Sequence, residues 1–557
     1  ILIRSNEINL SRLDLFLALK SFITSDFLLQ RAEIVFFEND IKDLTKITNI
    51  FVPRIINKQI KKIFSKGEIE GEFIIPFNSD GSIAENYTIN AKVLHADINI
   101  NSDLKINNLS TDIKYFFNSS NDKKINFHVH QGKILNLDLN KSSIDINLKD
   151  GKKIIKTKIK TSGTLNYSEI KIISSLLGYD LKNIKNIEFS SDLESSVKLL
   201  LDKRFKITDR EFSINGKIHN LNLKHKEVKN IKEFLPSYNS KIILKNSEIN
   251  FDPKNLLKIS GLIKFDKNFK DFSLSRNMNK NFNLVGNINL HDLSLKIPYL
   301  NYFKEKNIKA NIAFRINSSK SNYMISGLTY SSEKSKIESE LIKLNKKFEI
   351  EDVKNIRIIT FKKNIKNNDF YINKHTTLKN TISVKGKLFD VEPLLKSLYK
   401  TEDKKVFSKH FKRELKVNFD KTITGTNDDV SNFSLIASIK KGSFNKLSLK
   451  GNFSKNEIIE VSIYQLDENK RTLQVISDRA RPFIKNFNFI KGFEGGKLEY
   501  ESTIFKENTI SNLLITDFKI SKVPALAKLL TLASLQGIAD TLSGEGIRFQ
   551  SFEMKSY

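Results

Sequence analysis

The sequence alternates apolar and polar residues with a period of two over most of its length. Such alternation predicts β-strands with one apolar and one polar face, because successive side chains of a strand point to opposite sides of the sheet. Residues 125–129, 257–265, 282–290 and 447–453 show it clearly. The apolar positions that we expect to share one face are Phe127, Val129, Ile259, Ile263, Phe265, Leu284, Ile288, Leu447 and Leu449.

Strands of this kind recur from about residue 67 to the end of the chain, without a fixed repeat length. At roughly 12 to 15 residues for a strand and its turn, the chain supplies on the order of 35 strands. Open sheets rarely exceed about ten strands before twist accumulates. We therefore predict a mainly β protein with a few short helices, whose strands either coil into one long antiparallel β-sheet forming an apolar groove or split into several sheets. The family resemblance described below favours the coiled sheet. The pattern alone leaves open a compact sandwich, whose apolar faces would bury one another.

Helical spacing of apolar residues interrupts the strands at four places. The segment 44–64 is divided by Pro53 and ends at Gly67, while 168–177 and 391–398 are short. The most apolar segment is 523–542, where Pro524 suits a first helical turn and Gly537 separates two short helices. Its apolar residues are Leu526, Leu529, Leu530, Leu535, Ile538 and Leu542. No run of about 20 apolar residues is free of charge, so we expect no bilayer-spanning segment.

The charge balance first suggests a nucleic-acid partner. The 557 residues include 93 Lys and Arg against 63 Asp and Glu, a net charge of +30. Only 14 of the basic residues are Arg, however, and specific readers of nucleic acid depend on arginine for bidentate contacts. We therefore expect no nucleic-acid partner. The lysines fit either an ordinary solvated face or attraction to an anionic lipid surface.

Catalytic and metal-binding chemistry finds little support. The chain has no cysteine, which excludes disulfides, zinc fingers and thiol catalysis. His128 and His130 share one face of a predicted strand, but no third metal ligand can be identified. Residues 492–497 superficially resemble a phosphate loop, yet they lack its spacing and predict a plain turn. We expect no enzyme, no cofactor and no metal.

The C-terminal region carries a resemblance to a known family. Residues 518–530, 535–540 and 543–549 resemble the characteristic C-terminal region of the AsmA-like superfamily, most closely its YhdP and TamB types. Residues 386–395 are similar to the strand-to-helix element of that family, and Leu15 to Phe37 to the strand, helix and strand after its membrane anchor. One departure is Arg479-Ala480-Arg481, where the family more often has an acidic and small-residue start to a helix.

The resemblance implies a bridge-like lipid transport protein of the periplasm, anchored in the inner membrane by an N-terminal helix. That helix would precede this sequence, which we interpret as an internal piece of a longer chain. Phospholipids would move along the groove between the inner and outer membrane surfaces and support outer-membrane biogenesis. The segment 523–542 would then either insert at the outer membrane or cap the groove.

The same interpretation divides the chain into three parts. Residues 1–66 would follow the anchor, 67–475 would form the extended β-groove, and 476–557 would be the AsmA-like C-terminal region. The alternative function is a structural or adhesive β-protein that carries no lipid. No partner protein can be named from the sequence.

Overall fold

The computed structural model of the protein describes most of the chain. The described residues are 10–17, 28–43, 62–119, 121–176, 180–202, 206–227, 229–278, 282–319, 321–374, 378, 380–397, 410–441, 443–467, 470–484, 491–505, 508–522 and 546–556. The predicted helices of 523–542, with Leu526, Leu529, Leu530, Leu535, Ile538 and Leu542, lie outside these residues. Contacts between residues divide the chain into two compact units, Ile1–Glu227 with Asn239–Lys280, and Val228–Tyr238 with Asn281–Tyr557.

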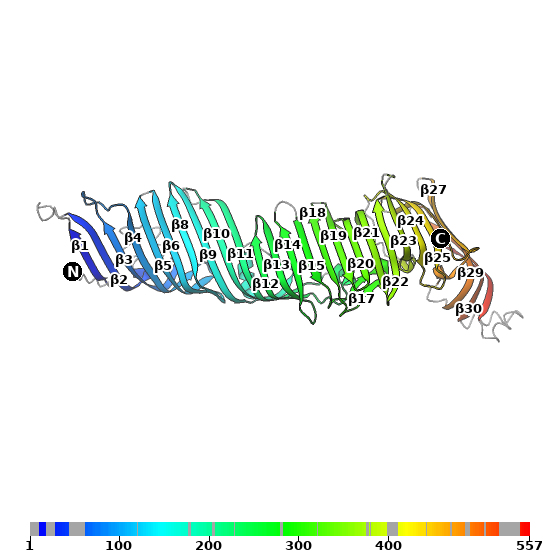
Figure 1. The fold of residues 1–557 in the computed structure, drawn as a ribbon, viewed down its shortest axis with the longest axis horizontal. Coiled ribbons are helices and arrows are strands. Elements are labelled where there is room, and N and C mark those ends of the chain that lie inside the picture. Colours follow the sequence, from blue (N-terminus) through cyan, green and yellow to red (C-terminus); the bar gives the residue numbers. More distant parts are fainter. Residues whose placement is uncertain are drawn as a thin grey trace. The chain divides into compact units, whose positions relative to one another are not determined.

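The first unit is a sheet of sequential antiparallel strands (Figure 1). Each strand pairs with the next along the chain except at β7, a short strand that pairs with β6 and β9 while β6 pairs directly with β8. The helix α3 (Tyr167–Leu176) lies between β9 and β10. The strands are β1 (Leu10–Leu17), β2 (Leu29–Asp40), β3 (Phe64–Pro76), β4 (Tyr87–Asn99), β5 (Lys105–Ser119), β6 (Asp122–Ile134), β7 (Leu137–Leu139), β8 (Ser142–Lys149), β9 (Lys152–Leu165), β10 (Ile184–Leu201), β11 (Ile207–His225), β12 (Lys241–Asp252), β13 (Leu256–Lys264) and β14 (Lys270–Asn277).

The second unit repeats this plan with one insertion. Its first strand, β15 (Phe282–Asn289), pairs with β18 (Asn311–Ser318), and the chain between them forms β16 (Leu295–Ile297), η2 (Pro298–Leu300) and β17 (Tyr302–Lys304). The remaining strands are β19 (Asn322–Ser332), β20 (Ser335–Asn345), β21 (Ile350–Lys362), β22 (Ile365–Lys374), β23 (Thr381–Asp390), β24 (Arg413–Ile423), β25 (Val430–Lys440), β26 (Ser443–Asn452), β27 (Ile458–Asp467), β28 (Lys470–Ser477), β29 (Lys491–Phe505), β30 (Asn508–Lys522) and β31 (Ile547–Ser556). The helices are α4 (Lys229–Phe234), α5 (Glu392–Ser397) and α6 (Arg481–Ile484).

The predicted fold class is confirmed: the protein is mainly β, its strands form antiparallel sheet and its helices are few and short. One pair departs from the antiparallel rule, because β23 and β24 run parallel. A parallel pair needs a connection of a dozen or more residues that returns the chain to the same end of the sheet. Residues 391–412, which begin with α5, provide that connection.

Two local predictions about helices are confirmed and one boundary is wrong. Helices α3 (Tyr167–Leu176) and α5 (Glu392–Ser397) form where helices were predicted at 168–177 and 391–398, and residues 177 and 398 lie outside the described residues. Most of the predicted helix 44–64 lies outside the described residues, and β3 already begins at Phe64, before the expected stop at Gly67. Pairing with Ile98 draws Phe64 into the sheet.

The predicted turn at 492–497 is also wrong, because these residues belong to β29. Gly495 and Gly496 take positive φ values of 67° and 82° inside that strand. Gly495 stands opposite Phe518 of β30, so the glycines bend a paired strand and do not end it. Among the described residues, no helix is long and apolar enough to span a membrane.

The three-part division at residues 66 and 475 stays a prediction. The first of these positions falls inside the first compact unit and the second falls inside the second.

Candidate functional site

Apolar residues of neighbouring strands stand opposite one another along one face of the first unit. Phe127 of β6 is paired with Ile113 of β5 and with Ile144 of β8. The same row of partners continues through Phe36, Gly71, Ala91, Thr157, Val197 and Phe212. We call this side of the sheet the apolar face. It forms because alternation places every second side chain of each strand on it.

The second unit has an apolar face of the same construction. Ile288 pairs with Ile312, and this row continues through Tyr330, Ile337, Ile358, Phe370, Gly386, Phe419 and Phe433. Another row contains Leu449 and runs through Leu435, Val461, Val475, Tyr500 and Leu513. Phe370 and Phe419 meet edge to face, with 5.5 Å between ring centroids. Cross-strand apolar pairs of this kind stabilise the sheet and make one continuous apolar surface.

Strands of the first unit contain bulges that keep the apolar face continuous. In β4, His95 has a φ of 49° and the pairing with β5 shifts register between Val93 and Ala96. Such a bulge bends a strand and strengthens its twist. Residues on either side of it, Val93 and Ala96, pack into one buried cluster with Leu109 and Val129. The bulge thus leaves both residues on the apolar face.

Bulges of this kind, marked by a residue with positive φ, recur in several other strands. Described strands of both units contain a residue with positive φ in their interior, and several of these residues coincide with shifts in register. Asparagine and glycine are frequent among them, since they tolerate the left-handed backbone best. The positions are Glu38 in β2, His95 in β4, Asn108 in β5, Asn246 in β12, Gly327 in β19, Asn355 in β21, Asn432 in β25 and Asp517 in β30.

The structure places the predicted lining residues on the apolar faces, in separate groups. Ile259, Ile263 and Phe265 meet in one cluster with Leu244 and Phe272, whereas Val129 belongs to the cluster around Val93. Phe127, also in the first unit, is paired with Ile113 and Ile144. The second unit contains the other four predicted residues, and each of them faces an apolar partner on a neighbouring strand. The pairs are Leu284 with Ile316, Ile288 with Ile312, Leu447 with Ile463, and Leu449 with Val461.

Much of the apolar face is only half-buried. Along β10, the side chains on this face include Leu193, Val197 and Leu199, and all three are partly exposed. Of the 18 residues in β10, Ser191 alone is buried. The inward side chains of a two-layer sandwich would be buried, because the opposing layer covers them. On the apolar face at β10, part of the apolar surface is therefore left exposed and not covered by a second layer of sheet.

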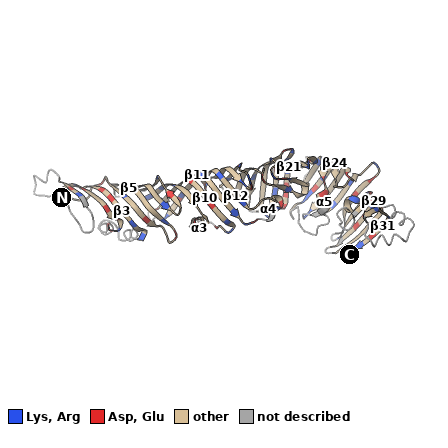
Figure 2. Cartoon of the chain, turned by 90° about the horizontal axis from the view of Figure 1, so that it is seen from below, with Lys and Arg blue, Asp and Glu red and all other residues tan. Residues whose placement is uncertain are grey.

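The opposite face of the sheet is charged. Lysines on it pair with carboxylates of adjacent strands, as in Lys92–Glu70 at 3.2 Å, Lys158–Glu194 at 3.0 Å and Lys450–Glu460 at 2.8 Å. Figure 2 shows lysines and arginines interspersed with acidic residues along the strands. Exposed pairs of this kind contribute about 0 to 1 kcal/mol each. The charges thus keep the outer face in water and distinguish it from the apolar face.

The insertion of the second unit is held against the sheet by a buried polar network that the sequence did not predict. Asn368 donates to the carbonyl of Leu300 at 2.7 Å and to Thr360 at 2.8 Å. The hydroxyls of Tyr302 and Tyr330 are 2.7 Å apart, and burial raises the pKa of Tyr330. Because Tyr330 belongs to the apolar row of Ile288 and Ile312, the insertion lies over the apolar face at this end of the strands.

Lys304 completes the anchoring of the insertion. Its ammonium group donates to the carbonyls of Leu290, His291, Leu293 and Glu305 at 2.6–3.2 Å. Burial lowers the pKa of Lys304 to about 8, so it remains protonated at neutral pH. This lysine is structural, and the pattern of apolar and polar residues around it in the sequence gave no sign that it is buried.

The arginines at the departure from the family pattern also have structural partners. Arg479 and Arg481 bind the two carboxylate oxygens of Asp428, at 2.7 and 2.6 Å. Burial alone would raise the pKa of Asp428, but hydrogen bonds from Arg481 and Arg479 outweigh it and lower that pKa. The pair fixes the start of α6, and Ala480, directly before the helix, and Ile484 within it are buried in one cluster with Phe493 of β29 and Phe518 of β30.

The histidine pair shows no ligand geometry of its own. The rings of His128 and His130 are in edge contact, and His130 lies 2.8 Å from Asp112. No group of three or more potential metal ligands occurs within the described part of the chain. In comparisons with known proteins, no family model, no curated protein and no solved structure matches this chain.

Proposed function

We propose that this protein is a non-enzymatic carrier of phospholipids, which hold their acyl chains on the apolar face and their headgroups in water. The observation that carries the proposal is the continuity of the apolar rows across successive strands, combined with the partial exposure of β10. An apolar face of this kind suits a flexible hydrocarbon chain, because each CH₂ group removed from water contributes about 0.8 kcal/mol.

Lipid could move along the apolar face because similar rows of apolar residues repeat from strand to strand. An acyl chain that shifts from one strand to the next exchanges one apolar contact for a similar one, so neighbouring positions have similar free energies. No residue needs to perform chemistry. Net direction would come from a supply of lipid at one end and its removal at the other.

The cellular setting of the proposal rests on the resemblance to the AsmA-like superfamily. On that basis the protein would lie in the periplasm, anchored to the inner membrane, and would move phospholipids between the inner and outer membranes during outer-membrane biogenesis. Of the predicted lining residues, Phe127, Ile259, Phe265, Leu284, Ile288, Leu447 and Leu449 are partly exposed and would contact the acyl chains, whereas Val129 and Ile263 are only 7% and 5% exposed and would support the face from within.

A substitution in β10 tests the proposal. We expect Val197→Asp, on the apolar face, to reduce the phospholipid that copurifies with the full chain at least fivefold, because a carboxylate there repels hydrocarbon. Leu200→Asp is the matched control, since Leu200 is equally half-buried on the opposite face of the same strand. The measurement is quantitative mass spectrometry of lipids extracted from the purified proteins.

Two results would contradict the proposal. One is a wild-type protein that carries no phospholipid, which would favour the structural or adhesive alternative. The other is equal lipid in the two variants. Val197 suits this test better than Ile263, because Ile263 is only 5% exposed and a carboxylate there would destabilise the cluster around Leu244.

A further inference from the structure

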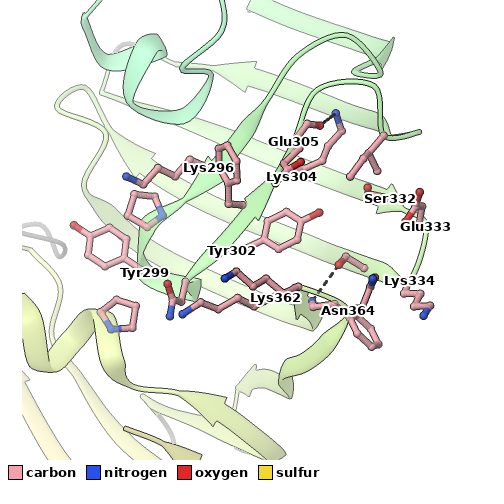
Figure 3. A pocket seen from close by; sticks show the side chains of 18 of the residues that line it. Lys296, Tyr299, Tyr302, Lys304, Glu305, Ser332, Glu333, Lys334, Lys362 and Asn364 are labelled. Carbon is pink, nitrogen blue, oxygen red and sulfur yellow. Dashed lines mark hydrogen bonds between the residues drawn. The ribbon is translucent and has the colours of Figure 1, made fainter. Parts of the chain in front are cut away.

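A cavity of about 1140 Å³ lies beside the insertion of the second unit (Figure 3). Its walls are the insertion itself, the turn between β19 and β20, the turn between β21 and β22, the first turn of α5 and the chain around the end of α4. All of these elements belong to the second unit.

The cavity carries an excess of positive charge. Five lysines and three glutamates line it. Lys304 is occupied by backbone carbonyls, and Lys362 pairs with Glu392 at 3.2 Å. The other three, Lys296, Lys334 and Lys363, are exposed, and their ammonium groups form no hydrogen bond or ion pair with any residue that the structure describes.

The lysines lie on both sides of the cavity. Figure 3 shows Lys296, Tyr299 and Lys362 extending toward one side, whereas Lys334, Glu305 and Glu333 lie on the other. An anion at Lys296 would not meet Glu305 or Glu333. Ammonium groups attract phosphate strongly and impose little geometry on it.

Large apolar side chains stand beside these lysines. Tyr299 is 45% exposed, Phe303 52% and Leu394 42%, and all three line the cavity. Exposed apolar surface next to free ammonium groups suits a ligand in which an anionic group adjoins hydrocarbon. An inorganic anion would use only the lysines.

The cavity meets the apolar face at the ends of two strands. Its lining residues Ser332 and Ser335 are paired with each other, and the same alternation that places Tyr330 and Ile337 on the apolar face places these serines there too. Tyr330 and Ile337 are themselves buried, at 3% and 8% exposure, so the apolar surface open to a ligand at the cavity is that of Tyr299, Phe303 and Leu394.

We infer that this cavity binds the phosphate of an anionic glycerophospholipid whose acyl chains contact the exposed side chains of Tyr299, Phe303 and Leu394. The inference rests on the proposed function and adds a headgroup site to it. Free glycerol phosphate carries the same phosphate chemistry, so the test must separate the two sources.

The test compares two triple variants of the full chain. Lys296→Gln, Lys334→Gln and Lys363→Gln together remove the three free charges of the cavity. Lys347→Gln, Lys412→Gln and Lys455→Gln remove three exposed charges of the same unit that do not line it. Calorimetric titration with dihexanoylphosphatidylglycerol, below its micellar concentration, measures affinity in each.

We expect the cavity variant to bind this lipid at least tenfold more weakly than the wild type, and the control variant within twofold of it. Neutral dioctanoylglycerol should bind all three proteins alike. Equal affinity of the wild type and the cavity variant for phosphatidylglycerol would overturn the inference. Glycerol 3-phosphate binding as tightly as the lipid would overturn the assignment to a phospholipid.

The outcomes also separate this inference from the proposed function. If the cavity variant binds phosphatidylglycerol normally while Val197→Asp loses copurifying lipid, the headgroup site is wrong and the carrier function stands. If the wild type binds neither phosphatidylglycerol nor dioctanoylglycerol, the carrier function itself is wrong.

Discussion

The apolar face is built in the same way at β10 and at β28–β30, but only the second region is covered. Around α6, the cluster of Ala480, Ile484, Phe493 and Phe518 is buried, with exposures of 7% or less. At β10, equivalent side chains such as Val197 and Leu199 stay half-buried. One turn of helix thus converts an open apolar surface into a core, so the sequence pattern of the strands cannot by itself distinguish a lining from a core.

The largest effect that this comparison predicts is on stability. We expect Phe518→Ala to lower the free energy of unfolding of the second unit by about 3–5 kcal/mol, the usual loss for a large aromatic side chain in a core. The same truncation at β10, Val197→Ala, removes fewer contacts and should cost less than about 1.5 kcal/mol. Urea unfolding followed by circular dichroism measures both. Equal losses would mean that the two regions are packed alike.

A smaller effect on stability is expected from the ion pairs that hold α6 in place. Asp428→Asn weakens two hydrogen-bonded pairs, with Arg479 and Arg481, and should reduce stability at pH 7 by roughly 1–3 kcal/mol. The side chain of Asp428 is 4% exposed while those of the arginines are about one-third exposed, which keeps this cost below that of a fully buried pair.

The pH dependence of stability checks the same ion pairs. The folded-state pKa of Asp428 is lowered, so its contribution is present above the ordinary pKa of aspartate, about 3.9, and disappears as the pH falls through the folded-state value. The difference between wild type and Asp428→Asn should therefore shrink below about pH 4. A difference that grows on acidification would contradict the assignment.

The smallest effect on stability is expected from substitutions on the charged face, opposite the apolar face at β10. Lys158→Ala removes the pair with Glu194, whose side chains are 52% and 35% exposed, and should change the stability of the first unit by less than about 0.5 kcal/mol. Lipid binding should not change, because this residue faces away from the apolar face. A loss of copurifying lipid in this variant would mean that the two faces have been assigned wrongly.

The sequence predicted the strands and their apolar positions well, because period-two alternation reports directly on which side chains share a face. The register confirms this for Phe127 and Leu449, which stand among apolar partners on both sides. Their role in contacting lipid stays a prediction. Whether a row is open or covered was not predictable, since that depends on segments distant in sequence, such as α6.

Three features escaped the sequence analysis for identifiable reasons. Bulge residues such as Asn108 and Asn246 look like ordinary polar positions, although asparagine inside an alternating strand is a signal for them. The polar network of Asn367 and Asn368 resembles an exposed strand face, because burial of paired polar groups leaves no apolar trace. The parallel direction of β24 depends on the path of the connection that precedes it.

Pairing of each strand with its neighbour along the chain also bears on how such a protein can be made. Most contacts in both units join segments that are adjacent in sequence, so closing each new hairpin costs little loop entropy. Folding can then advance by adding one hairpin at a time to an existing sheet edge, as in other quasi-one-dimensional architectures. A polypeptide that emerges gradually from a ribosome or a translocation pore could assemble in step with its delivery, without waiting for its far end.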